Sequence, residues 1–283
     1  MATPSPKAFA DLLQSAVTDP GIISRAYRQF HTYSLGNQLL AMFQGHERNI
    51  PPGPINTFPG WKALGRHVRK GERAITLCMP ITVKRRDSAD AADTDRDDPD
   101  GPEVFTRFVY KSRWFVLSQT EGQELPEPEI PAWDRDRALH GLDVREIPFE
   151  HIDGNTLGFA RKRTIAINPV NTLPHKTRFH ELAHVLLGHT AEGQQADSEI
   201  TPRNLRECEA ESVALLCCAA LDLPGVAECR GYVQNWWGQG NPIPERSAQR
   251  ILKAADQILK AGTTEAEAGT TNAKAGTDQG VRS

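Results

Sequence analysis

The sequence predicts an α+β fold in two domains. Segments with the apolar spacing of helices alternate with short strand-like segments, and a proline-rich stretch at 124–131 divides the chain. A chain of 283 residues is also long enough for two small domains with separate cores. We therefore expect a basic α+β domain at 1–123, a linker at 124–135 and a second domain at 136–261. The remainder at 262–283, rich in Gly, Thr and Ala, is expected to be a disordered tail.

The first domain is expected to begin with helices and continue into strands. Apolar residues between Pro20 and Gln44 have helical spacing, which predicts one helix or a pair. A short helix is expected at 61–67, and alternating patterns predict strands at 74–83 and 104–117. Between these strands, residues 87–103 contain eight acidic side chains among Asp, Ala, Pro and Gly, so a disordered loop is expected there.

The second domain is expected to be a small sheet with helices. A largely apolar helix is expected to start near Pro174, whose missing N–H costs little in a first turn, and to stop at Gly188. Another helix is expected between the capping residue Thr201 and the turn at Asp222. The expected strands are 142–148, 156–160 and 163–168, and the expected closing helix is 244–261.

Composition is typical of a globular protein, with 39% hydrophobic and 24% charged residues. The N-terminus lacks the basic and then apolar profile of a signal peptide, and the longest apolar run, 213–221, is too short to span a bilayer. Five cysteines without a C-x-x-C pair suit a reducing compartment better than a disulfide framework. We therefore expect a cytoplasmic protein without membrane association.

Residues 180–184 read His-Glu-Leu-Ala-His, and the two histidines lie four apart in the expected apolar helix. At that spacing their imidazoles share one face and can bind one divalent metal ion. In zinc peptidases with H-E-x-x-H, the metal acidifies a water molecule and the glutamate takes its proton. We expect His180 and His184 to bind Zn²⁺, with Glu181 as general base, although such sites also accept other divalent metals. The competing interpretation is a pair of buried histidines that only hydrogen-bond.

A zinc site needs a third protein ligand, and the acidic run 207–211 is the nearest supply. Glu207 and Glu211 are four apart on one helical face, whereas Glu209 is expected to point away. We expect Glu207 to be the third ligand and Glu211 to orient a ligand imidazole, with the reverse assignment also possible. Favourable charge at a helix N-terminus would explain one or two of the three glutamates without a metal.

Other ligand sets fit the sequence less well. A third histidine in the pattern H-E-x-x-H-x-x-G-x-x-H would need Gly at 187 and His at 190, where this chain has Leu187 and Thr190. His189 is instead expected at a helix C-terminus, where the dipole favours a partly protonated imidazole, and His175 is expected to be a similar bystander. Cys208 is a remote alternative ligand.

Charge is distributed unevenly along the chain. Residues 1–86 contain twelve Lys and Arg against four Asp and Glu, and basic residues return after the acidic stretch. Aromatic side chains lie among these cations, as single-stranded nucleic-acid binding requires, because bases stack on rings while cations contact phosphates. Any one of these rings can equally belong to the core. The rings are Tyr27, Phe30, Tyr33, Phe58, Trp61, Tyr110 and Trp114.

Several segments resemble the ArdC-type antirestriction proteins. Residues 33–40, 57–72 and 115–120 resemble the N-terminal domain of that family, and residues 180–184, 207–214 and 231–236 resemble its zincin-like metallopeptidase domain. The resemblance covers roughly residues 8–261 in order. It implies a single-stranded DNA-binding domain followed by a metal-binding, peptidase-like domain, carried on plasmids or other mobile elements. In that family's E-x-x-A-E pattern the first Glu is the third ligand, which matches Glu207. The Asp-rich insert is not part of the family pattern.

The sequence therefore predicts a zinc-dependent, peptidase-like protein that binds single-stranded DNA and protects incoming DNA or processes proteins on it. One alternative is a DNA-binding protein in which zinc only braces the fold, and another is a protease that cleaves a repressor. The peptide substrate is not indicated. The residues expected to contact DNA are Tyr33, Asn37, Trp61, Arg66, Arg69, Lys70, Arg73, Lys111 and Arg113.

Overall fold

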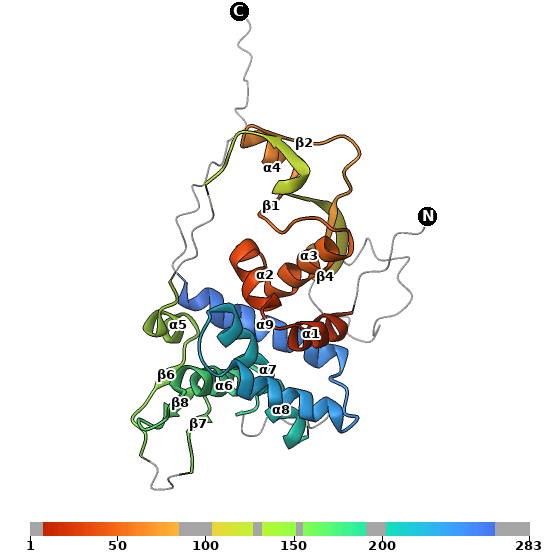
Figure 1. Ribbon diagram of the computed structural model, residues 1–283. Coiled ribbons are helices and arrows are strands. Elements are labelled where there is room, and N and C mark those ends of the chain that lie inside the picture. Colours follow the sequence, from red (N-terminus) through yellow and green to blue (C-terminus); the bar gives the residue numbers. More distant parts are fainter. Residues whose placement is uncertain (1–7, 85–103, 127–131, 151–154, 191–201, 264–283) are drawn as a thin grey trace, which may run out of the picture.

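The computed structural model describes residues 8–84, 104–126, 132–150, 155–190 and 202–263. The predicted acidic loop lies outside these residues, as do positions 127–131 of the predicted linker and 264–283 of the predicted tail. The described residues form helices and small sheets, which confirms the predicted α+β class (Figure 1). No helix among them is long and apolar enough to cross a membrane.

The helices are α1 (Phe9–Thr18), α2 (Ile22–Phe30), α3 (Leu35–Glu47), α4 (Phe58–Ala63), α5 (Arg135–Gly141), α6 (Pro174–Leu186), α7 (Arg203–Ala220), α8 (Val226–Gly238) and α9 (Glu245–Gly262). The strands are β1 (Ile55–Thr57), β2 (Arg66–Val68), β3 (Ile75–Lys84), β4 (Val104–Val116), β5 (Thr120–Gly122), β6 (Arg145–Glu146), β7 (Gly158–Arg161) and β8 (Thr164–Ile167). A 3₁₀ turn, η2 (Leu117–Gln119), joins β4 to β5. The sequence patterns do not predict α1, α5, α8, β1 or β5, and the helix predicted at 61–67 is observed at Phe58–Ala63, with residues 66–67 in β2.

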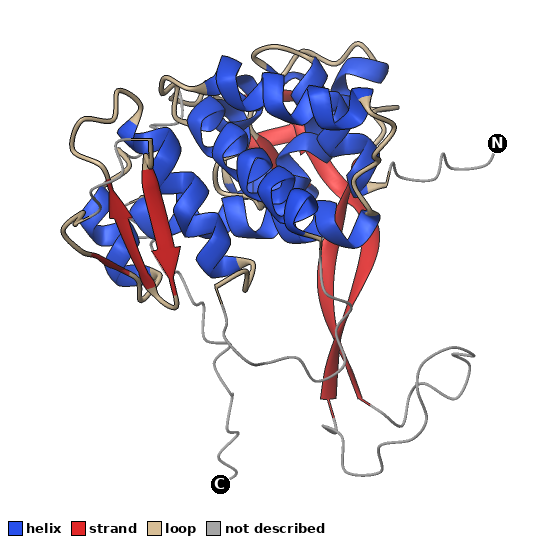
Figure 2. Ribbon diagram, turned by 90° about the horizontal axis from the view of Figure 1, so that it is seen from below, coloured by secondary structure: helices blue, strands red, loops and turns tan. Residues whose placement is uncertain are grey.

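The first sheet is antiparallel in the order β1-β4-β3, and β3 and β4 form a long hairpin that extends beyond the helices (Figure 2). Helix α3 covers the free edge of β3 with two amide side chains. Asn37 accepts from the Cys78 N–H at 2.8 Å and donates to the Cys78 carbonyl at 2.9 Å. Gln44 lies two turns later on the same face. It accepts from the Thr76 N–H at 2.9 Å and donates to the Thr76 carbonyl at 2.7 Å. These amides replace a neighbouring strand and satisfy the edge.

A two-stranded antiparallel sheet pairs β2 with β5, and a third sheet has the order β6-β8-β7, with β6 parallel and β7 antiparallel to β8. Helix α6 packs against β7 and β8. Within the described part of the chain, β7 pairs with β8 alone, so β7 is an edge strand. This sheet therefore places an edge strand beside the helix that carries the H-E-x-x-H motif.

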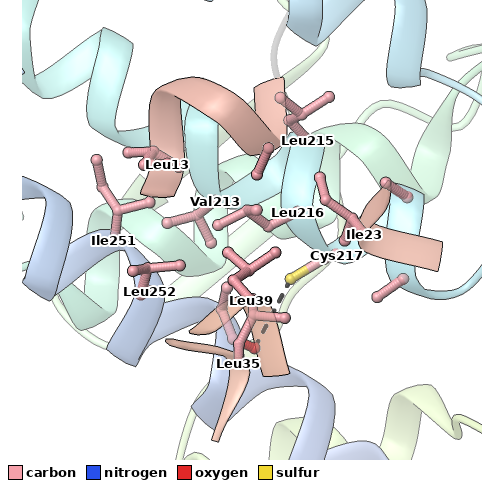
Figure 3. Close-up of a cluster of buried hydrophobic side chains, with 14 of the residues drawn as sticks. Leu13, Ile23, Leu35, Leu39, Val213, Leu215, Leu216, Cys217, Ile251 and Leu252 are labelled. Atoms are coloured by element: carbon pink, nitrogen blue, oxygen red, sulfur yellow. Dashed lines mark hydrogen bonds between the residues drawn. The ribbon is translucent and has the colours of Figure 1, made fainter. Parts of the chain in front are cut away.

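The two halves of the chain share one hydrophobic core. In Figure 3, side chains of α1, α2 and α3 interleave with those of α7 and α9 around Leu39. Every residue of α7 from Cys208 to Ala220 is buried, so this helix needs cover on all sides, and the N-terminal helices supply part of it. The separate cores expected from chain length are therefore not found in the described residues.

Polar contacts also join the halves. The Glu245 carboxylate on α9 accepts from the backbone N–H groups of Phe9 and Ala10 at 3.1 and 2.8 Å, where α1 begins. Asp256 on α9 accepts from the Leu35 N–H at 3.1 Å, where α3 begins. First-turn N–H groups have no partner within their own helix, so α9 completes both helix starts.

Candidate metal centre

Helix α6 holds the two motif histidines at the boundary between the core and a cleft. Phe179, Leu182 and Ala183 are fully buried and fix the helix in the core, whereas His180 and His184 are only partly buried. The helix begins at Pro174, in agreement with the predicted start, although Leu173 occupies the N-cap without a side-chain hydrogen bond. The histidines therefore project from a rigid support.

Three side-chain atoms converge beside this helix. The Nε2 atoms of His180 and His184 are 3.0 Å apart. The Glu207 Oε2 from α7 lies 3.4 Å from the His180 Nε2 and 3.6 Å from the His184 Nε2. Two ligands at the usual zinc distance of about 2.0–2.1 Å in a tetrahedron are separated by roughly 3.3 Å. The three atoms thus have the spacing that one divalent metal ion requires, and they form the metal-ligand group of the described residues.

Glu211 lies on the other side of the His180 ring. Its Oε1 is 3.4 Å from the His180 Nδ1, and it accepts from the Lys176 Nζ at 2.7 Å. The His180 Nδ1 and the Glu211 Oε2 are buried without a hydrogen-bond partner. This placement favours Glu207 as ligand and Glu211 as the carboxylate behind the ligand, because a metal on Nε2 leaves Nδ1 to donate to Glu211.

The electrostatics follow from these contacts. Burial opposes protonation of His180, but the carboxylates of Glu207 and Glu211 outweigh it and raise the pKa of His180 to about 9. The imidazoles of His180 and His184 hold the pKa of Glu207 well below its usual range. Burial alone would raise the pKa of Glu211, but His180 and Lys176 lower it to about 2. In the metal-free protein the carboxylates of Glu207 and Glu211 thus lie on either side of the protonated imidazole of His180.

Glu181 faces the same cleft. Only 7% of it is exposed, and burial raises its pKa while the neighbouring histidines oppose the rise. The cleft has a volume of about 540 Å³. The three converging atoms, Glu181 and the edge strand β7 share this one opening. Residues of β7, α6, the segment after α6, and α7 line it: Gly158, Phe159, Ala160, His180, Glu181, His184, His189, Thr190, Arg203, Arg206 and Glu207.

His189 lies just after the C-terminus of α6, as expected, but its expected partial protonation and the expected orientation of Glu209 are wrong. The His189 Nδ1 lies 3.0 Å from the His184 Nδ1, and the His189 Nε2 lies 2.8 Å from the Glu209 Oε2. Glu209 is completely buried and does not point away from the site. Burial lowers the pKa of His189, although Glu209 opposes this, so the expected partly protonated imidazole is not favoured.

A local signal for His189 is present in the sequence. Gly188 has a φ of +74°, and the His189 N–H bonds the His184 carbonyl at 2.8 Å while the Gly188 N–H bonds the Val185 carbonyl at 3.2 Å. This is a Schellman helix end, which places the side chain after the glycine over the residue five positions earlier. The glycine stop therefore predicts the contact between His189 and His184.

The alternative ligands lie elsewhere. Both ring nitrogens of His189 face His184 and Glu209, so they are not directed at a metal shared with His180. Cys208 is buried, and burial raises the pKa of its thiol to about 12. His175 packs near the rings of Trp133 and Phe179.

Four of the expected DNA contacts have internal partners. Trp61 is 1% exposed and donates from Nε1 to the Phe115 carbonyl at 2.9 Å. The Tyr33 hydroxyl donates to the Ile55 carbonyl at 3.0 Å, and Asn37 holds the edge of β3. Arg66 donates to the Thr120 hydroxyl at 2.8 Å and to backbone carbonyls. These residues build the first domain, and Trp61 has no ring face open to a base.

The remaining expected contacts are exposed. Lys70, Arg73, Lys111 and Arg113 form no ion pair with any described residue, whereas Arg69 donates to the Ser118 carbonyl and pairs with Glu72 at 3.4 Å. Rings are also exposed nearby, including one that the sequence patterns do not single out. These rings are Phe58 at 53%, Phe108 at 65% and Tyr110 at 40% exposure. On β4 the rings at 108 and 110 lie on the face opposite to Lys111, and Arg113 lies at the irregularity where the β3–β4 register shifts.

Comparisons with known proteins agree with this architecture. Residues 14–113 match the family model for the N-terminal domain of anti-restriction factor ArdC, and residues 137–224 match that for the IrrE N-terminal-like domain of a peptidase family. The uncharacterized protein y4eC of Sinorhizobium fredii is 28% identical over 247 residues, covering 78% of this chain and 74% of y4eC.

Two crystal structures of the antirestriction ArdC protein from plasmid R388 share the fold. The metal-free structure aligns with a TM-score of 0.52 at 18% identity, covering 90% of this chain and 97% of that protein. The Mn(II)-bound structure aligns with a TM-score of 0.51 at 19% identity, covering 90% and 96%. Together with the two family models, they confirm the resemblance inferred from the sequence.

Proposed function

We propose that this chain is a metal-dependent, peptidase-like protein of the ArdC antirestriction type that binds single-stranded DNA, because residues 14–113 match the ArdC N-terminal domain and residues 137–224 match the IrrE N-terminal-like domain. It would act in the cytoplasm on DNA of an incoming mobile element. The observation that carries the proposal is the convergence of His180, His184 and Glu207 beside the buried Glu181.

The donor set fits a catalytic divalent metal site. Three protein ligands at 3.0–3.6 Å from one another leave a fourth tetrahedral position, and Glu207 is 37% exposed on the cleft side. A metal in such a site polarises a carbonyl group and acidifies water. The Mn(II)-bound structure of the R388 protein supports a divalent ion, and both Zn²⁺ and Mn²⁺ suit histidine and carboxylate ligands.

The protein's own groups have separate roles. His180, His184 and Glu207 hold the metal, and Glu211 orients His180. Glu181, whose pKa burial raises, takes up a proton from water. Strand β7 lines the same cleft and is an edge strand, so an extended peptide could pair with it by backbone hydrogen bonds. The arrangement supports hydrolysis of a peptide bond.

A Glu181→Gln variant tests the catalytic interpretation. Metal binding should survive, because Glu181 is not a ligand, while cleavage of an unstructured protein substrate such as casein should fall at least about 100-fold. Protection of transferred DNA from a restriction enzyme is measured in the same variant. Loss of protection would link hydrolysis to antirestriction, whereas wild-type cleavage by the variant would refute the role of Glu181. If metal removal lowers the melting temperature while protection persists in Glu181→Gln, the metal only braces the fold.

The exposed cations and rings of the first domain support DNA binding. Phosphates are attracted by Lys70, Arg73, Lys111 and Arg113, and bases can stack on the rings at 58, 108 and 110. The exposed rings at 108 and 110 and Lys111 lie on opposite faces of β4. We therefore propose that single-stranded DNA wraps around the β3–β4 hairpin instead of lying in one groove.

Salt-dependent titration of a fluorescent single-stranded oligonucleotide tests this. Affinity should fall steeply with salt, and Lys111→Ala should reduce the slope of log K against log salt by about 0.7. Lys253→Ala, an exposed lysine on α9, is the matched control and should leave the slope unchanged. Salt-independent binding, or equal effects of the two variants, would refute the interface.

A further inference from the structure

A chain of three side chains leads from the partly buried His184 of the candidate metal site to a fully buried carboxylate. His184 on α6 contacts His189 through their Nδ1 atoms at 3.0 Å, and the His189 Nε2 contacts the Glu209 Oε2 on α7 at 2.8 Å. The side chain of His189 is 5% exposed and that of Glu209 is fully buried. Such a carboxylate is costly to bury unless it is paired and hydrogen-bonded.

Further contacts hold this chain in place. The Arg250 Nη1 on α9 lies 3.8 Å from the Glu209 Oε1, and the Arg250 Nη2 donates to the Leu187 carbonyl at the end of α6. The Schellman turn at Gly188 fixes the backbone of His189. Groups from α6, α7 and α9 thus meet where α6 ends, so the arrangement depends on the tertiary fold and not on one element.

The hydrogen bonds allow one consistent assignment of protons. An ionised carboxylate only accepts, so Glu209 requires the proton of neutral His189 to be on Nε2. The Nδ1 of His189 then carries a lone pair and accepts from His184, whose own proton must be on Nδ1. The Nε2 of His184, which faces His180 and Glu207, is left with its lone pair free.

From this geometry we propose that His189 and Glu209 are positioning residues that hold His184 in the tautomer and orientation needed to bind the metal. The inference rests on the proposed metal site and deepens it. On the other ligand, Glu211 stands directly behind His180, so each histidine has its own carboxylate support. His184 reaches its carboxylate through a second imidazole.

Two variants interrupt the chain at different points. His189→Ala removes the acceptor for the His184 Nδ1–H. Glu209→Gln keeps shape but introduces an amide that can donate to the His189 Nε2, which reverses the proton arrangement and blocks the His184 Nε2. Each variant is expected to weaken Zn²⁺ and Mn²⁺ binding about 10- to 100-fold in a competition titration with a chromogenic chelator. The d–d absorption of bound Co²⁺ should also change, since it reports coordination geometry.

Further variants separate positioning from general stability. His189→Asn can place an amide oxygen near the former Nδ1 and should restore most of the affinity. Glu209→Gln should add nothing to His189→Ala, because both act through one path. Glu146→Gln is the matched control: it breaks the carboxylate pair with Arg178 on α6, at 2.7 Å, and should lower stability without changing metal affinity.

Metal binding by the wild type and the variants distinguishes failure of the metal site from failure of the positioning role of His189 and Glu209. Wild-type protein that binds neither Zn²⁺ nor Mn²⁺ would refute the metal site and this role with it. Metal binding by the wild type with unchanged affinity and Co²⁺ spectrum in both His189→Ala and Glu209→Gln would refute the positioning role alone. Additive losses in the double variant, or an equal loss in Glu146→Gln, would assign the pair to fold stability instead.

Discussion

Metal binding should release a proton from His180. In the metal-free protein burial opposes protonation of His180, but Glu207 and Glu211 outweigh it and raise the pKa of His180 to about 9, so this imidazole is mostly protonated at pH 7.5. A metal ligand must be neutral, hence about one proton leaves His180 for each metal bound at pH 7.5 and about half a proton at pH 9. The apparent affinity should therefore rise about tenfold per pH unit between pH 7 and 8.5 and level off above pH 9.

The measurement is isothermal titration calorimetry with Mn²⁺ at pH 7.5 in two buffers of different ionisation enthalpy. The difference in observed enthalpy gives the number of protons released. Glu211→Gln is the informative variant, because it removes one of the two carboxylates that raise the pKa of His180 and should reduce proton release. Tight metal binding without proton release at pH 7.5 would show that His180 is not protonated in the metal-free protein.

The same cluster makes the stability of the metal-free protein depend on pH. The folded pKa of His180 lies above its unfolded value of 6.5, so its contribution is complete below pH 6.5 and is lost as pH rises through 9. Each pKa unit corresponds to about 1.4 kcal/mol, which gives a contribution on the order of 3 kcal/mol. The pKa of Glu211 is lowered to about 2, so its contribution is present above pH 4.5 and is lost towards pH 2. The cluster therefore favours the metal-free fold most between about pH 4.5 and 6.5.

Two further predictions concern packing and the sheet edge. A Cβ at Gly158 would lie 2.7 Å from the Thr177 Cγ2 and 3.3 Å from the Glu181 Oε1, so Gly158→Ala should destabilise the protein by about 1–3 kcal/mol in urea unfolding. Gly231→Ala on α8, where a Cβ would have nothing within 4 Å, should stabilise the protein by up to about 1 kcal/mol. Equal effects of the two substitutions on the free energy of unfolding would contradict the close contact at Gly158. Asn37→Ala should lower the free energy of unfolding by about 1–3 kcal/mol, because the Cys78 backbone loses both partners. Lys111→Ala should leave it unchanged in the same assay. A larger loss in Lys111→Ala than in Asn37→Ala would contradict the structural role of Asn37 and favour a DNA contact at its surface.

Local patterns in the sequence were sufficient to predict the start, the end and the histidine spacing of helix α6, which carries the motif. The spacing of His180 and His184, the start at Pro174 and the stop at Gly188 depend on interactions within one or two helical turns. The structure also places Glu207 beside both histidines, as helix periodicity in α7 suggests. The start, the stop and the histidine spacing depend on the geometry of one helix, whereas the contact of Glu207 with the histidines also requires α7 to pack against α6.

The roles of the DNA-binding candidates depended on burial, which periodicity alone does not decide. Trp61 and Asn37 have residue types suited to nucleic-acid contacts, but one fills the core and the other pairs with a strand edge 41 residues away in sequence. Which ring or amide faces solvent is set by the elements packed against it.

By itself the sequence determined the α+β class, the order of the two family domains, and two histidines and a glutamate on one helix. Only the tertiary structure decided that both halves share a core, that Glu207 and Glu211 stand on opposite sides of His180, and that Glu209 reaches His184 through His189. The physical reason is range: helix starts, stops and faces depend on neighbouring residues, whereas the partners of a buried charge come from whichever distant helices cover it.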